Sequence, residues 1–156
     1  MVKAYSRIKR GMPLVILGNY TPDTNPFHKA VLDAAGDEVK FVGAIYDKDV
    51  VQALRFFARL YVHGHTVGGT NPSLVEALGA GSPVLAHNNR FNRWVAGKGA
   101  CYFSSEAECA TQISTLIQDD ELVKSMRRHS LKQMRDNFTW DKIHQAYEQL
   151  LLEKLN

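Results

Sequence analysis

Residues 60–87 have the sequence LYVHGHTVGGTNPSLVEALGAGSPVLAH, and this stretch decides the fold class. It begins with the apolar run 60–63 and ends with a second run, 84–87, and a helical segment at 71–80 lies between them. Continuous rather than alternating hydrophobicity is typical of strands that are covered on both faces, as in parallel sheets. The stretch therefore predicts a strand, a loop, a helix and a second strand parallel to the first.

The same alternation extends along the rest of the chain. Further apolar runs lie at 14–17, 39–42 and 100–103. Helical segments are predicted at 2–10, 26–35, 47–58, 105–118, 120–137 and 141–155. Repeated strand–helix units predict an α/β fold of Rossmann-like type, a doubly wound parallel sheet of about five strands with helices on both faces.

The first predicted element is unusual for this fold class. A Rossmann-like domain opens with its central strand, whereas residues 2–10 are predicted to be a helix. We therefore expect residues 1–156 to be one Rossmann-like domain whose first strand is absent.

Composition excludes several classes of protein. An apolar fraction of 45% and a charged fraction of 22% are ordinary for a globular domain. A net charge of +3 does not indicate a nucleic-acid partner. Cys101 and Cys109 lack metal-ligand spacing and predict buried thiols in a reducing compartment. The short apolar run after the basic start is no signal peptide or membrane span, so we expect a cytoplasmic protein.

The loop between residues 63 and 72 carries the most chemistry. The paired glycines Gly68 and Gly69 allow the backbone to approach an anion closely. The N–H groups at the start of the following helix, next to Asn71, favour a diphosphate there. An ordinary glycine turn is the alternative.

Side chains next to this loop extend the predicted site. Thr70 and Ser73 add hydroxyl donors for the same anion. Glu76 lies one helical turn further on, where its carboxylate can accept hydrogen bonds from ribose hydroxyls, as the acidic residue of Rossmann folds does.

Other candidate ligands follow the ends of neighbouring strands. His65 is expected to hydrogen-bond a phosphate or a sugar hydroxyl, with a plain loop histidine as the alternative. His63 and His65 form a His-x-His pair, but no third ligand accompanies them and we expect no metal. Asn19 follows the first visible strand, and Arg90 and Arg93 lie in a polar loop where they could pair with phosphate.

A basic face marks the helix predicted at 120–137. It serves solubility or a peripheral contact with anionic lipid at the inner face of the membrane. Its residues are Lys124, Arg127, Arg128, Lys132 and Arg135.

Residues 72–86, PSLVEALGAGSPVLA, closely resemble the donor-binding signature of retaining, glycogen-synthase-like GT-B glycosyltransferases. The tail 137–140, NFTW, followed by Ile143 and Tyr147, is similar to the aromatic closing helix of these enzymes. The variant GGTNPSLVEA at 68–77, together with Phe91-Asn92-Arg93, resembles bacterial rhamnosyltransferase-like members that serve polysaccharide biosynthesis. The resemblance covers nearly the whole chain.

The resemblance implies transfer from a nucleoside-diphosphate sugar with retention, and without a cofactor or an obligatory metal. Glu76 matches the second carboxylate of the family's paired-glutamate motif, and Gly69, Thr70 and Asn71 match the loop near the sugar and phosphates. Gly68 stands where the first carboxylate is expected. The resemblance makes residues 1–156 the nucleotide-sugar-binding domain, and it places the N-terminal acceptor-binding domain, or a partner subunit that supplies it, outside these residues. We assign no catalytic residue here, and expect these residues alone to be inactive because the reaction needs the cleft between two domains.

Two other functions remain open. The missing carboxylate at Gly68 is compatible with a non-catalytic module that binds a nucleotide sugar and regulates a partner. A nucleotide-sugar epimerase of the GT-B fold would need acid–base groups from across the cleft, and the sequence does not exclude it.

Overall fold

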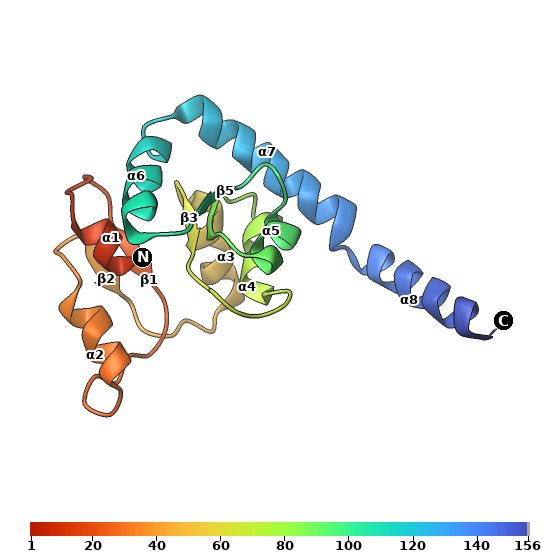
Figure 1. Cartoon of the computed structure of the whole chain (residues 1–156), viewed down its shortest axis with the longest axis horizontal. Helices are drawn as coiled ribbons and strands as arrows, with labels where there is room; N and C mark the ends of the chain where they lie inside the picture. Colours follow the sequence, from red (N-terminus) through yellow and green to blue (C-terminus); the bar gives the residue numbers. More distant parts are fainter. Residues whose placement is uncertain (156) are drawn as a thin grey trace.

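The computed structural model describes residues 1–155 as an α/β structure (Figure 1). Its strands are β1 Leu14–Ile16, β2 Val39–Phe41, β3 Tyr61–His63, β4 Val84–His87 and β5 Cys101–Phe103. Its helices are α1 Val2–Ser6, α2 Pro26–Asp33, α3 Lys48–Phe57, α4 Pro72–Gly79, α5 Arg90–Ala96, α6 Glu106–Leu116, α7 Asp120–Asn137 and α8 Trp140–Leu155.

The strands are all parallel, which confirms the predicted fold class, but they form two sheets. In the first sheet β1 pairs with β2, with Leu14 opposite Val39. In the second sheet the order is β3-β4-β5, with Tyr61 opposite Val84. Among the described residues, β1 and β3 therefore each pair on one side only. The two sheets are thus separated by a break in the hydrogen bonding between strands.

A shared hydrophobic cluster joins the two sheets across this break. Ile16 and Val39 of the first sheet belong to the same buried cluster as Leu85 and Phe103 of the second. The cluster is completed by the buried side chains of α1, which are Val2, Ala4 and Tyr5, by those of α6, and by Met126 of α7. Packing, and not backbone hydrogen bonding, thus holds the two sheets together.

Helix α1 ends at Ser6 and not at Arg10, so the prediction of a helix at 2–10 was too long. The Arg10 side chain turns back and donates to the carbonyls of Tyr5 and Ile8, and its backbone N–H donates to a carboxylate oxygen of Glu38 (2.8 Å). Ile8, which lies beyond the end of the helix, is exposed.

Helix α7 lies across the second sheet's helices, and most of its predicted basic face has partners within the chain. Arg127 donates to the carbonyls of Phe56 (3.0 Å) and Ala58 (2.5 Å) at the end of α3, and also to Gly81 after α4. The ion pairs Lys124–Glu121 and Lys132–Asp136 lie along the same helix. Arg127 therefore anchors the ends of two helices.

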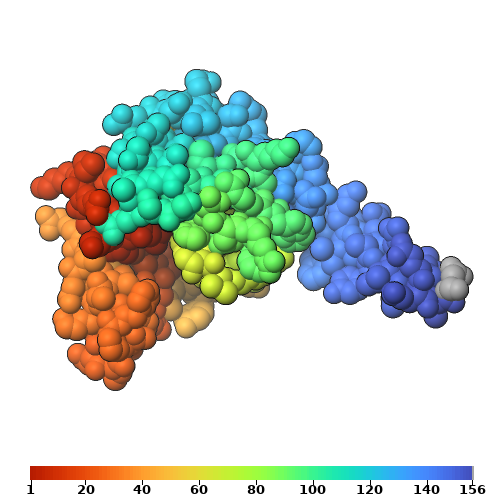
Figure 2. Space-filling view, in the orientation of Figure 1, coloured from red at the N-terminus to blue at the C-terminus, as the bar shows by residue number. Residues whose placement is uncertain are grey.

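Helix α8 extends away from the rest of the molecule as an arm (Figures 1 and 2). Within its described residues no side chain is buried, and Trp140 and Tyr147 are largely exposed. No helix in residues 1–155 combines the length and the apolar character needed to cross a bilayer.

Candidate functional site

The start of α4 is closed by the side chain of Asn71. Its Oδ1 accepts from the backbone N–H of Ser73 (3.1 Å) and from the Ser73 hydroxyl (2.6 Å). Pro72 has no N–H, and the N–H of Leu74 donates to the Asn71 carbonyl (3.1 Å). The N–H groups that we expected to be open at this helix start are therefore already used, because the cap residue satisfies them.

Backbone N–H groups without a partner lie in the loop that precedes α4. Within residues 1–155 no hydrogen bond engages the backbone N–H groups of Gly68, Gly69 or Thr70. All three residues are exposed. Gly68 has a φ of +131°, which favours glycine. A Cβ at Gly69 would meet no protein atom within 4 Å, so the missing side chain keeps the space beside the loop open. Consecutive free amides of this kind are suited to bind an anion.

Glu76 lies one turn into α4 and is half exposed, as the predicted ribose contact requires. Its Oε2 forms an ion pair with Nη2 of Arg55 from α3, at 2.7 Å. Helix α3 lies beside α4 (Figure 1). Arg55 was not among the predicted site residues, because its partner lies 21 positions away along the chain and no local pattern links the two.

The carboxyl end of β3 carries a stack of rings. The imidazoles of His63 and His65 lie 4.6 Å apart with an interplanar angle of 19°, and the Tyr61 ring stacks on the other side of His63 at 5.9 Å. His63 is 1% exposed, and among the described residues its Nε2 has no hydrogen-bond partner. Burial, and then the neighbouring His65, lowers the pKa of His63 to about 4. The buried imidazole is thus neutral near pH 7, while His65 is exposed at the loop.

Two asparagines at the start of α5 hold the other end of the loop. Asn89 and Asn92 both donate through Nδ2 to the His65 carbonyl, at 3.0 and 2.9 Å, and Asn92 also donates to the His87 carbonyl (2.9 Å). Asn92 is 3% exposed. The loop after β3 is therefore fixed at its first turn and open at Gly68–Thr70.

The predicted phosphate ligands Arg90 and Arg93 lie on α5, where we expected a loop. Arg93 donates through Nε to Oδ1 of Asn88 (2.6 Å), and its guanidinium lies 4.4 Å from the centre of the Tyr102 ring. Arg90 lies over the ring of Phe91 at 4.6 Å. Both arginines thus have contacts within the chain.

The remaining candidate, Asn19, bridges two loops. Its Oδ1 accepts from the backbone N–H of Ala44 (3.2 Å), which ties the loop after β1 to the loop after β2. These loops belong to the first sheet, whereas all other candidate residues belong to the second.

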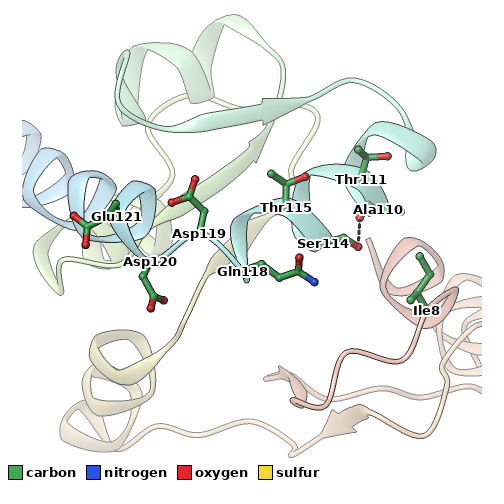
Figure 3. Close-up of a pocket in the computed structure, with 9 residues that line it drawn as sticks. All are labelled: Ile8, Ala110, Thr111, Ser114, Thr115, Gln118, Asp119, Asp120 and Glu121. Atoms are coloured by element: carbon green, nitrogen blue, oxygen red, sulfur yellow. Dashed lines mark hydrogen bonds between the residues drawn. The ribbon is translucent and has the colours of Figure 1, made fainter.

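A pocket lies elsewhere, along α6 and its junction with α7 (Figure 3). Most of the polar groups that line it serve local structure. Ser114 and Thr111 donate to carbonyls one turn earlier in α6, Asp119 caps α7, and Asp120 pairs with Arg59. Ile8 faces these groups from the other side. We therefore place the candidate site at the loop and not in this pocket.

Metal-ligating groups do not gather in the described part of the chain. No cluster of three or more His, Cys, Asp or Glu side chains in residues 1–155 could hold a metal ion. Cys101 and Cys109 are free, and burial raises the pKa of both thiols.

The profile of the family described as glycosyl transferase-like matches residues 1–149. The chain belongs to this family. Its fold matches the C-terminal, Rossmann-like domain of GT-B glycosyltransferases. No curated protein matches it in sequence.

Two solved structures share the fold of this family member. HepE from Anabaena, in complex with UDP and glucose, superposes with a TM-score of 0.82 at 18% identity, over 97% of this chain and 43% of HepE. Sucrose-phosphate synthase from Thermosynechococcus elongatus gives a TM-score of 0.79 at 20% identity, over 97% of this chain and 41% of the synthase. The chain thus spans less than half the length of these structural relatives.

Proposed function

We propose that this chain is the donor-binding part of a glycosyltransferase and that it binds the diphosphate of a nucleotide sugar at the loop Gly68–Thr70. The observation that carries the proposal is the run of unpaired amides in this loop. It adjoins a capped helix with the half-exposed carboxylate of Glu76 one turn further on. The complexes of HepE with UDP and with UDP-glucose support a nucleotide sugar as the ligand.

The role of each group follows from its place. The loop amides donate to the phosphate oxygens and stabilise the charge that develops on the leaving diphosphate. The exposed imidazole of His65 lies next to the same loop and donates to a phosphate or sugar hydroxyl. The Glu76 carboxylate accepts from the ribose hydroxyls. We expect this binding to need no divalent metal.

The acceptor and the rest of the reaction cleft are assigned to a second domain or a partner subunit. The coverage of less than half of each relative supports this assignment. We propose that the transfer retains the anomeric configuration of a hexosyl or deoxyhexosyl donor, with rhamnosyl as the first candidate. The anomeric proton of the product in an NMR spectrum tests this.

Calorimetric titration with UDP tests the binding site directly. Gly69→Ala should fold normally, because its Cβ meets no atom within 4 Å, and should weaken UDP binding by about tenfold or more by blocking the approach of the diphosphate. Gly79→Ala, at the far end of α4, is the matched control and should bind UDP as the wild type does. EDTA should change neither titration. Equal UDP affinity for wild type and Gly69→Ala, or no binding by the wild type, would refute the proposed site.

A further inference from the structure

The ion pair between Arg55 and Glu76 is unequal in burial. The Arg55 side chain is 14% exposed and the Glu76 side chain 51%. Only Oε2 of Glu76 takes part in the pair, and within residues 1–155 no hydrogen bond or ion pair engages Oε1. The arginine thus approaches from the protein side, and one carboxylate oxygen remains for a ligand.

Arg55 is fixed by its own backbone. Its carbonyl accepts from the hydroxyl of Ser82 (2.8 Å), which is fully buried in the turn between α4 and β4. The Ser82 carbonyl in turn accepts from the Ser130 hydroxyl of α7 (2.7 Å). The backbone that carries the guanidinium is therefore hydrogen-bonded to the turn after α4, and this turn is hydrogen-bonded to α7.

The pair lies in a polar cluster on the side of α4 that faces α3. Ser73 and Glu76 are three residues apart and so share one face of the helix. Burial raises the pKa of Tyr61, and the neighbouring Ser73 hydroxyl and Arg55 guanidinium counteract this effect. Tyr61 and Arg55 are thus close to each other and to the helix start that adjoins the loop.

An ion pair with one half-exposed partner contributes little to stability, because water screens it and two long side chains lose freedom. The main effect of such an ion pair is to fix the position of the glutamate side chain. A free glutamate side chain samples several rotamers, whereas one held through Oε2 keeps Oε1 in one place, which lowers the entropic cost of binding a ligand there.

We propose that Arg55 is a positioning residue for nucleotide recognition: it holds Glu76 so that the second carboxylate oxygen meets the ribose diol of the bound donor. This inference rests on the proposed function. It concerns the ribose contact and not the diphosphate, so the two can fail separately.

The experiment compares UDP with 2′,3′-dideoxy-UDP by calorimetric titration. Wild type should prefer UDP by about tenfold to a hundredfold, the range expected for hydrogen bonds to a charged group. Glu76→Gln should lose most of this preference. Arg55→Met keeps Glu76 but should also reduce the preference for UDP several-fold. Arg55→Lys should retain more of this preference than Arg55→Met does. Affinity for the dideoxy nucleotide should stay within about twofold in the variants.

Arg59→Met is the matched control. Arg59 pairs with Asp120 of α7 at 2.7 Å, so this variant removes an ion pair of similar length, made by a neighbouring arginine away from the loop. It should keep the wild-type preference for UDP. Thermal melting of each variant confirms that it is folded, and if Arg55→Met does not fold, Arg55→Lys alone carries the test.

The outcomes separate the two proposals. If the wild type binds neither nucleotide, the proposed function fails. If the wild type prefers UDP and Arg55→Met keeps that preference in full, or weakens both nucleotides equally, Arg55 is structural and the inference is overturned. Loss of the preference in the Arg59→Met control would overturn it as well.

Discussion

The two sheets belong to units that differ in how they are packed. The first unit, residues 14–41, holds β1, α2 and β2. The second unit, residues 61–103, runs from β3 to β5. In the second unit β4 is covered on both faces and α4 buries Leu74, Ala77 and Leu78 completely. In the first unit α2 buries no side chain and Val15 of β1 is 38% exposed.

This difference shows where rigidity is concentrated. The candidate loop, the ring stack at β3 and the Arg55–Glu76 pair all adjoin the second unit. A binding site needs a scaffold that keeps its donors in place, and dense packing on both faces supplies it. The first unit is held mainly through the cluster that it shares with α1 and α6.

The same leucine-to-alanine change in each unit tests this comparison most severely. Leu78→Ala should lower the free energy of unfolding by about 2–5 kcal/mol, because it leaves a cavity in a fully buried site. Leu32→Ala, in the partly exposed α2, should cost about 1 kcal/mol or less. Urea unfolding followed by circular dichroism measures both, and equal losses would contradict the comparison.

The pH dependence of the unfolding free energy gives a second test of how tightly the second unit is packed, through its buried His63. His63 has a folded pKa of about 4 against an ordinary 6.5, because burial opposes its charge. Between these values the unfolded chain binds a proton that the folded chain does not. Stability should therefore fall as the pH drops from 6.5 to 4, by up to about 3 kcal/mol.

His63→Asn removes this titration and supplies the reference. The unfolding free energy of the variant should depend less on pH between 6.5 and 4 than that of the wild type. Parallel curves for the two proteins would show that His63 is not kept neutral by the fold.

The helix caps give the smallest expected contrast. Asn25 and Asn71 each precede a proline, and each accepts backbone N–H bonds through Oδ1. Asn71→Ala should cost about 1 kcal/mol, because α4 is part of the core. Asn25→Ala should cost less than about 0.5 kcal/mol globally, because α2 buries no side chain and can fray alone. Denaturant midpoints measure both, with Asn→Asp at each position as the control, which should restore the cap.

Much of the fold could be predicted from local sequence. Each predicted strand agrees with the observed one within one residue at either end, because each apolar run is short and most are followed by glycine or asparagine. Helix α5 was missed because its short segment, RFNRWVA, is rich in polar and charged residues. Its two boundary residues were present in the sequence, Asn89 as the N-cap and Gly97 as the C-cap. In the structure Gly97 has a φ of +69°.

The candidate site likewise has a part that local sequence predicts and a part that it does not. The loop and the start of α4 form one continuous segment with a recognisable pattern, so Gly68, Asn71 and Glu76 could be singled out in advance. Arg55 could not be, because only the packing of α3 against α4 brings it to Glu76. The Asn71 cap explains the error at the helix start, since the geometry of a side chain decides which N–H groups stay free.

The break between the sheets also bears on how the chain folds. Within residues 1–155 each strand pairs only with strands adjacent to it in sequence, and no strand pair joins the two sheets. Each ladder therefore closes a single crossover, which keeps the contact order of the sheets low and the entropic cost of loop closure small. Side chains of the shared hydrophobic cluster then join the two halves.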